Sequence, residues 1–194
     1  AVEKGLGEKF ANNLFDLILK FAGYGFNKSH STGYSIIAFQ TAYLKTYFPV
    51  QYMAAVLTFE SGARKTEDWA PYIGDCRRVI FPDHSKGNRH VGFEVGPPDI
   101  NRSDTDFSVV FDEEEEHTNI NGNIRFGLGA VKGAGNVAVS AIVEERNTNG
   151  PFTSIFDFCS RVSGKSANRA TIESLIKGGA FDVFHGVDSR SALL

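Results

Sequence analysis

The sequence predicts a mainly α fold, in which a helical N-terminal part is followed by a small β-hairpin and a tandem helix–hairpin–helix unit. Apolar residues recur at helical spacing in several segments before residue 80. Two β-prone stretches, "FSVVF" (107–111) and "NIRFGL" (123–128), flank a polar run and predict the hairpin. A glycine-rich turn and further helical patterns follow, up to residue 180.

Composition places the chain among ordinary folded proteins. Its 194 residues are 42% hydrophobic and include 17 Phe, enough for one or two cores. No apolar run reaches the roughly 18 to 20 residues that a membrane span needs, and the first ten residues lack the pattern of a signal peptide. Cys76 and Cys159 are expected to be buried free thiols in a reducing cytosol, so we predict a cytoplasmic protein without a membrane partner.

The N-terminal part is expected to consist of consecutive helices. Residues 12–21 place apolar side chains on one side of a helix, which an Asn caps and Gly23 ends. A loop over 23–34 leads into a helix over 31–48, and apolar residues on several faces of that helix predict its burial. Pro49 ends this helix and starts the next one, so the two are expected to form a helical hairpin.

The middle of the chain is expected to be less regular. An amphipathic pattern predicts a third helix over about 67–80, and a loop with short extended pieces such as "HVGFEV" (90–95) follows. The acidic run "DEEEEH" (112–117) falls at the predicted hairpin tip, where neighbouring side chains alternate faces, which favours a solvated loop over a metal site. The histidines of this region lack the spacing of zinc ligands: His84, His90 and His117.

Helices are predicted again in the C-terminal third. The patterns cover residues 135–146, 153–162 and 169–179, with a capping box between Ser154 and Asp157 and a glycine at the last helix end. Charge is segregated along the chain. Residues 60–119 carry seven basic and fourteen acidic side chains, whereas the segments before and after are mildly basic. This pattern permits a nucleic-acid contact at the basic segments without requiring one.

The stretch "KGAGNVAVSAI" (132–142) joins a lysine and a Gly-x-Gly turn to a helix, and three interpretations are open. Its G-x-G-x-x-A pattern occurs in dinucleotide-binding folds, although no apolar strand runs into the first glycine. A helix–hairpin–helix would instead hold a phosphate with the amides of the second helix start and with Lys132. In the third interpretation the glycines only let two helices pack closely.

The stretch "GYGFNKSHSTGY" (23–34) gathers polar side chains in front of a long apolar helix. Free amides at a helix start, together with Lys28 and His30, suit a polyphosphate or a nucleic-acid backbone. Tyr34 and its aromatic neighbours could stack on a base or anchor the loop. A capped helix start without a ligand is the structural alternative.

Longer motifs carry a family resemblance. The segment "KFAGYGFNKSHSTGYSIIAFQTAYLKTYFPVQYMAAVLT" (20–58) closely resembles the fingers region of the alpha subunits of bacterial DNA polymerase III, the replicative C-family polymerases. Further on, "PPDINRS", "IRFGLGAVKGAG", "FTSIFDFCSRV" and "NRATIESLIKGGAFD" resemble the path of the same family from the fingers into its helix–hairpin–helix region. The resemblance covers most of residues 10–183.

This resemblance implies a domain division and two groups of site residues. Residues 1–119 would be the fingers region, 120–183 the helix–hairpin–helix region, and 184–194 a tail. The incoming nucleotide or the template would be bound by fingers residues: Asn27, Lys28, Ser29, His30 and Tyr34. Among these, Lys28 is the expected phosphate partner because a lysine is charged at neutral pH. Duplex backbone would be bound by the glycine hairpin: Lys132, Gly133, Ala134, Gly135 and Asn136.

The resemblance also implies an activity and partners. The chain would be a fragment of a DNA-directed DNA polymerase, a nucleotidyltransferase, with primer–template DNA, the incoming deoxynucleotide, the sliding clamp and other replicase subunits as partners near the nucleoid. The Mg²⁺ ions of that chemistry would be held by palm carboxylates that this fragment lacks, so it is expected to bind without catalysing. The loop over 80–96 departs from the family pattern by about ten extra residues, within the ordinary range of surface loops. The alternative is a stand-alone helix–hairpin–helix accessory protein of repair or recombination.

Overall fold

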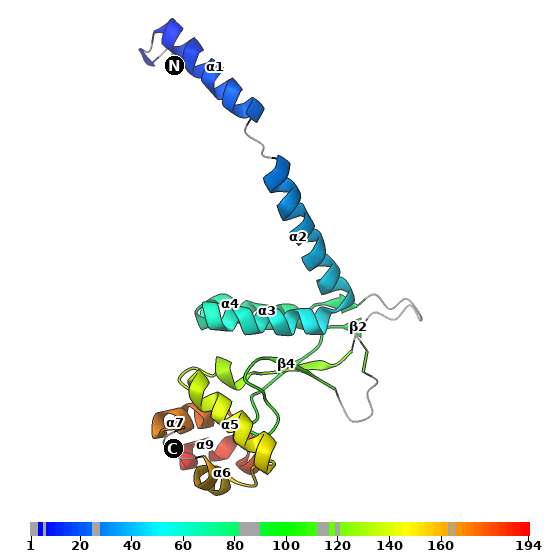
Figure 1. Cartoon of the computed structure of the whole chain (residues 1–194), viewed down its shortest axis with the longest axis vertical. Helices are drawn as coiled ribbons and strands as arrows, with labels where there is room; N and C mark the ends of the chain where they lie inside the picture. Colours follow the sequence, from blue (N-terminus) through cyan, green and yellow to red (C-terminus); the bar gives the residue numbers. More distant parts are fainter. Residues whose placement is uncertain are drawn as a thin grey trace. The chain divides into compact units, whose positions relative to one another are not determined.

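The computed structural model describes residues 4–5, 7–24, 28–81, 90–111, 117–118, 121–162, 164 and 166–194. The fold is mainly α with small sheets, as predicted (Figure 1). Tertiary contacts divide the chain into two units, residues 1–43 and 44–194. The domain boundaries expected after residues 119 and 183 stay predictions.

Both helices that begin in the first unit are longer than predicted. Helix α1 (Glu8–Tyr24) starts before the expected Asn cap and continues through Gly23, because one glycine costs only about 1 kcal/mol against alanine in a helix. Helix α2 (Lys28–Tyr47) starts three residues early, so the second half of the predicted loop over 23–34 is helical. Within α2, the Thr32 hydroxyl donates to the Lys28 carbonyl oxygen at 2.7 Å.

The predicted burial of the helix over 31–48 is wrong for this chain by itself. No residue of α2 is buried, and large side chains such as Ile37 and Phe39 are exposed. An apolar pattern on all faces predicts burial only if other elements surround the helix.

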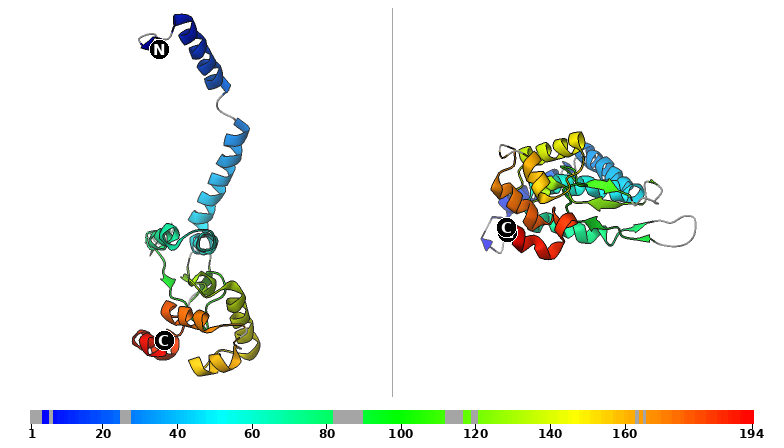
Figure 2. Two further views of the ribbon diagram at one scale, coloured as in Figure 1. Left: turned by 90° about the vertical axis from the view of Figure 1, so that its left-hand side faces the viewer. Right: turned by 90° about the horizontal axis from the view of Figure 1, so that it is seen from below.

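Helices α3 (Pro49–Ala63) and α4 (Thr66–Cys76) lie side by side and form one wall of the second unit (Figure 2). Pro49 stands at the first helical position, as predicted. The first core of this unit has α3 and α4 residues at its centre, among them Val50, Leu57 and Trp69. The hairpin expected between the helices over 31–48 and from Pro49 onward stays a prediction.

Helix α4 ends at Cys76, four residues before the predicted end. The chain turns after Cys76, whose carbonyl oxygen accepts from the Phe93 amide at 3.1 Å. Residues 80–81 then form strand β1 (Ile80–Phe81), paired antiparallel with β2 (His90–Val91). The apolar spacing predicts that Ile80 belongs to the helix. Pairing with β2 places it in a strand instead.

The predicted hairpin is present and carries one more strand. Strand β4 (Ser108–Val110) pairs antiparallel with β5 (Asn123–Arg125), and β3 (Val95–Gly96) pairs parallel with the other edge of β5. Two residues are too few for β3 to show as a period in the sequence. Beyond β5 the chain forms the 3-10 turn η2 (Leu128–Ala130) in place of the strand expected up to residue 128.

The C-terminal half of the second unit is a small helical bundle around its own core (Figure 1). Its main helices occupy the predicted segments: α5 (Asn136–Asn149), α6 (Ile155–Arg161) and α7 (Arg169–Gly178). The last residues add short turns that the sequence did not predict: α8 (Asp182–His185), η3 (Val187–Ser189) and α9 (Arg190–Leu193). Phe158 is fully buried, with its ring centroid 5.0 Å from those of both Phe152 and Phe181.

Two predicted helix ends are confirmed. The Ser154 hydroxyl accepts from the Asp157 amide at 3.1 Å, and Gly179 ends α7 in the left-handed conformation with φ +89°. The second half of the capping box differs, because the Asp157 carboxylate accepts from the amide of Thr153 at 2.9 Å. In a regular capping box this carboxylate would accept from the amide of the N-cap residue, which is Ser154 here. It accepts instead from Thr153, the residue before the cap.

Candidate nucleic-acid interface

The glycine turn before α5 has the geometry of a hairpin with an open helix start. After η2, the Ala134 amide donates to the Val131 carbonyl oxygen at 3.0 Å, and both Gly133 and Gly135 have positive φ, +90° and +76°. Gly135 is the residue before α5 and offers no side-chain cap. Among the described residues, no acceptor meets the amides of Asn136 and Val137. These donors therefore face an exposed site that suits an anion.

Helix α7 holds this turn from behind. The Thr171 hydroxyl donates to the Ala134 carbonyl oxygen at 3.2 Å, and Ala134 is fully buried. A Cβ atom at Gly133 would lie 2.6 Å from the Ser174 hydroxyl oxygen, so only glycine fits there. The Asn168 side chain caps α7 by accepting from the Thr171 amide at 2.9 Å. The turn is thus fixed by packing against α7, while its outer side stays exposed.

Lys132 projects from the outer side of this turn. It is exposed, and no ion pair between described residues includes it. Val137, the second residue of α5, is 84% exposed, which shows how little the described residues cover this helix start. The five residues predicted to grip duplex backbone, 132–136, therefore lie together in space, with four of them exposed and Ala134 buried as the packing point.

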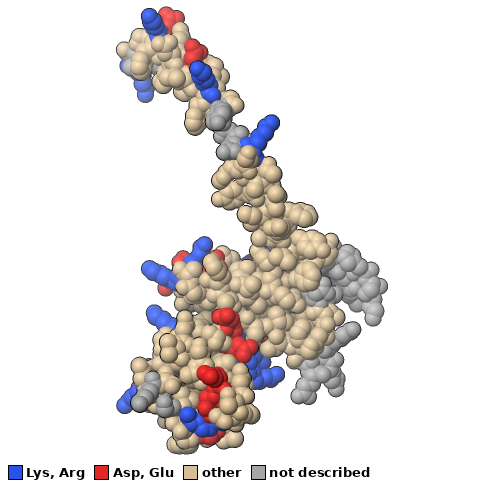
Figure 3. All heavy atoms as spheres, viewed as in Figure 1, with Lys and Arg blue, Asp and Glu red and all other residues tan. Residues whose placement is uncertain are grey.

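A groove separates the glycine turn from the corner between α3 and α4. Its volume is about 610 Å³, and its opposite walls include Arg64 and Lys65 on the corner and Lys132 on the turn. Figure 3 shows basic side chains at the end of the α3–α4 pair and again below it, while acidic side chains gather on another part of this face. No sequence signal pointed to this corner, because Arg64 and Lys65 stand far from the glycine turn along the chain and belong to no motif.

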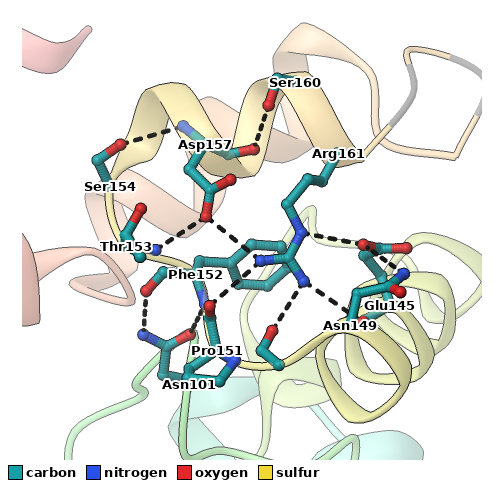
Figure 4. Close-up of polar contacts among 11 residues, drawn as sticks. Asn101, Glu145, Asn149, Pro151, Phe152, Thr153, Ser154, Asp157, Ser160 and Arg161 are labelled. Carbon is teal, nitrogen blue, oxygen red and sulfur yellow. Dashed lines mark hydrogen bonds and ion pairs between the residues drawn. The ribbon is translucent and has the colours of Figure 1, made fainter.

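An arginine fixes the frame behind the hairpin (Figure 4). The Arg161 guanidinium donates to the Glu145 carboxylate at 3.0 Å, to the Asp157 carboxylate at 3.3 Å and to the Gly150 carbonyl oxygen at 2.7 Å. It also stacks over the Phe152 ring at 4.4 Å. Arg161 thereby joins the end of α5, the connection and α6 at one point.

These contacts lower carboxyl pKa values. Hydrogen bonds from the side chains of Arg161 and Asn149 hold the pKa of Glu145 below its usual range. The pKa of Asp157 is lowered first by the Thr153 amide and then by Arg161. Both carboxylates are therefore stabilised in their charged form and act as structural partners.

A second arginine anchors the segment between β3 and β4. Arg146 of α5 is 8% exposed and donates to the carbonyl oxygens of Ile100 at 3.2 Å and Ser103 at 2.7 Å. Asn101 adds two hydrogen bonds to the backbone of Phe152, each 2.8 Å long. The "PPDINRS" motif thus has a packing role, since its backbone carbonyls accept from Arg146 of α5 and its Asn101 side chain bonds to Phe152 in the connection before α6.

The fingers cluster is divided between two sides of one helix start. Lys28, Ser29 and His30 lie in the first turn of α2 and are exposed; Asn27 lies outside the described residues. Residues two apart on a helix point to opposite sides, so Lys28 and His30 diverge. His30 instead faces Tyr34, one turn on, with ring centroids 4.5 Å apart in an edge contact. The helix by itself therefore does not bring Lys28 and His30 into one compact group.

Other candidate sites carry no functional geometry in the described part of the chain. Within it no three His, Cys, Asp or Glu side chains gather as metal ligands. The acidic residues 112–116 and His84 lie outside the described residues, and His117 stacks on Phe111 with centroids 4.1 Å apart. A dinucleotide fold is excluded at the glycine turn, since the 3-10 turn η2 stands between β5 and the first glycine.

The two cysteines differ from each other. Cys76 is buried, and burial raises the pKa of its thiol to about 11. Cys159 is exposed, so its predicted burial is wrong. Its neighbour on α6, Phe158, occupies the core position instead. Of the helices described, none combines the length and the apolar character required to cross a membrane.

Fold and site together define a helix–hairpin–helix protein, and comparison places the chain in that class. It belongs to the helix–hairpin–helix motif family, whose model matches residues 92–193. The whole chain is similar to DNA polymerase III alpha subunits, which confirms the resemblance stated above. The subunit of Deinococcus radiodurans is 47% identical over 184 residues, those of Thermus aquaticus 44% over 184 and Escherichia coli 39% over 182.

The alignments cover 94 to 95% of this chain and only 12 to 14% of the three relatives. The chain thus corresponds to one segment of a much longer polymerase subunit. This correspondence favours the polymerase interpretation over a stand-alone accessory protein, since the match extends through α1, α2 and α3 as well as through the hairpin region.

Proposed function

We propose that this chain is the DNA- and nucleotide-binding segment of a replicative DNA-directed DNA polymerase. The carrying observation is the exposed helix start of α5, where Lys132 and two open amides stand on a turn locked by α7. The similarity to polymerase subunits supplies the context. In this role the turn binds a phosphate of the primer–template duplex through main-chain donors, helix dipole and one lysine.

Such a contact reads no base sequence. Amides and lysines that meet phosphate oxygens position the protein on the duplex, and their affinity falls with salt because counterions are released. Each neutralised phosphate contributes about 0.9 to the slope of log affinity against log salt concentration. The hairpin therefore contributes affinity and register, while template pairing selects the nucleotide.

Replacing Lys132 by Ala in the full-length protein that carries this segment tests the duplex contact. We expect the salt slope for duplex DNA to fall in magnitude by about 0.9, measured by fluorescence anisotropy between about 50 and 200 mM KCl. Lys177→Ala is the matched control, because Lys177 is exposed in the same unit but pairs with Glu173 on α7. An unchanged slope in Lys132→Ala would remove the hairpin from the DNA interface.

For the nucleotide, Lys28 is the proposed partner of a phosphate. Tyr34, whose ring contacts His30, is the proposed stacking partner of a base. Lys28 is exposed at a helix start, and it has no ion pair within the described residues. The divergence of Lys28 and His30 around α2 assigns them to different parts of the ligand. Ser29 in the first turn of α2 and Asn27, which precedes Lys28 in the sequence, complete the proposed set.

Reversing the charge at Lys28 tests the nucleotide contact. In the full-length protein, Lys28→Glu is expected to raise the KM for deoxynucleotide at least tenfold, since an attractive contact with a triphosphate becomes repulsive. Steady-state primer extension at varied nucleotide concentration measures it. Lys20→Glu on α1 provides the control, and wild-type KM and kcat in Lys28→Glu would refute the assignment.

The chemistry itself is assigned to other parts of the polymerase. Nucleotidyl transfer uses two Mg²⁺ ions held by carboxylates, and the described residues offer no such group. We therefore propose Mg²⁺ as the cofactor of the whole subunit and binding as the task of this segment. The sliding clamp and other replicase subunits, and a place at the nucleoid, belong to the same proposal.

A further inference from the structure

The groove between the α3–α4 corner and the glycine turn is built from two parts of the chain. Ser61, Arg64 and Lys65 line one wall, and Lys132 and Asn136 line the other. Both walls belong to the same compact unit. A smaller recess of about 110 Å³ shares Ser61 and Asn136 with the groove and is also lined by Thr58 and Thr105. The groove thus continues into the recess and carries both polar and apolar residues.

Its charge is carried by a few identifiable side chains. Arg64 pairs with Glu60, with Nε and Oε2 2.5 Å apart, so this arginine is largely compensated. Glu67 is the acidic residue among those that line the groove, in the first turn of α4, where the helix dipole stabilises a negative charge. Lys65 and Lys132 are both exposed, and the described residues place no carboxylate in an ion pair with either. Two lysines without an ion-pair partner among the described residues therefore line the groove, one from the α3–α4 corner and one from the glycine turn, together with the carboxylate of Glu67.

The floor and one wall of the groove allow close approach of a ligand backbone. Gly133 and Gly135 line it without side chains, and a Cβ atom at Gly135 would meet nothing within 4 Å. Open glycine backbone with hydroxyl and amide side chains nearby suits the alternating phosphates and sugars of a nucleic-acid strand. A single small anion would leave most of the groove unfilled.

We propose that this groove binds one sugar–phosphate strand of the duplex, with Lys65 and Lys132 neutralising different phosphates from opposite walls. The inference rests on the proposed function and extends it, since it adds the α3–α4 corner to the DNA interface. The corner and the hairpin then act as a two-walled clamp on one backbone. The α3–α4 pair and the glycine hairpin then bind the same nucleic-acid strand.

The test compares salt slopes of duplex binding in the full-length protein. Lys65→Ala is expected to lower the slope by about 0.9, Lys132→Ala by the same amount, and the double variant by about 1.8. Lys65→Arg keeps the charge and is expected to keep the wild-type slope. Lys65 is exposed, so these variants leave the core intact, and Lys177→Ala again serves as the control.

The outcomes separate this inference from the proposed function. If Lys132→Ala lowers the slope and Lys65→Ala does not, the groove proposal is overturned and the hairpin contact stands. If neither variant lowers it, both are overturned. If Lys65→Ala alone lowers it, the two-walled clamp is overturned. Calorimetry with inorganic triphosphate gives a further check: binding lost in Lys65→Ala, with an unchanged DNA slope, would make the groove a polyphosphate site and overturn the strand proposal.

Discussion

Gly133 illustrates how a single residue sets the hairpin. Its φ of +90° lies in the region that favours glycine, and its missing side chain leaves room for Ser174 of α7. Gly135 shares the positive φ but borders open space. The two glycines of the Gly-x-Gly turn thus have different roles. Gly133 permits close packing against α7, and Gly135 leaves the outer side of the turn open.

We expect Gly133→Ala to destabilise the protein more than Gly135→Ala. Both substitutions force alanine into a left-handed conformation, which costs about 1 to 3 kcal/mol. Only Gly133→Ala adds a collision with Ser174. The free energy of unfolding from urea titration measures the difference. The double change Gly133→Ala with Ser174→Ala should recover the steric part, and equal losses in the two single variants would show that the close approach has no energetic weight.

At the scale of elements, Arg161 decides how α5 and α6 meet. No regular backbone pairing links these helices; the guanidinium bonds to Glu145, to Asp157 and to the Gly150 carbonyl oxygen bridge them instead. The hairpin depends on this frame, because α5 carries the open amides at its other end. A charged cluster at one end of α5 therefore orients the helix whose other end carries these amides.

Acid is expected to weaken this junction. The pKa of Glu145 is lowered in the folded protein, so its contribution to stability is full above the ordinary glutamate value of 4.5 and is lost as the pH falls through the lowered value. The same sign holds for Asp157. Thermal unfolding of Glu145→Gln between pH 6 and about pH 3 should show a shallower pH dependence of Tm. Glu144→Gln is the control, since Glu144 is exposed beside it. Identical slopes in both variants would contradict the role of Glu145.

At the scale of the whole molecule, the second unit rests on two cores that Phe126 connects. One core centres on α3 and α4, the other on the helical bundle, and Phe126 packs against both. Its ring centroid lies 4.7 Å from that of Phe107 and 6.0 Å from that of Trp69. Phe126 thus links the core beneath the α3–α4 corner to the core beneath the glycine turn.

Phe158 and Phe156 offer a matched test of the bundle core on one helix. Phe158→Ala should reduce the free energy of unfolding by about 3 to 5 kcal/mol, because it empties a fully buried site between two other rings. Phe156 is 80% exposed, so Phe156→Ala should have little effect. Denaturant titration measures both. A small loss in Phe158→Ala would mean that the bundle contributes little to the cooperative core.

Much of the hairpin region could be predicted from local patterns. The Ser154 cap and the Gly179 end of α7 follow from signals within a few residues of each other. The antiparallel pairing of residues 108–110 with 123–125 follows from two β-prone stretches that are consecutive along the chain. Boundaries failed where a distant contact competes with the local pattern. Helix α4 stops at Cys76 because Phe93 bonds there, and β3 exists because β5 offers an edge. No window along the chain contains such partners.

Sequence by itself determined the class of this protein, its order of elements and the residues of its glycine turn, because helix periodicity, turn glycines and long family motifs are local properties of the chain. Only the tertiary structure decided which side chains share a site. It separated Lys28 from His30 around one helix and brought Lys65 to the groove that Lys132 lines. The physical reason is that both results depend on side-chain direction and on the packing of segments distant in sequence, which residue order does not encode in any single stretch.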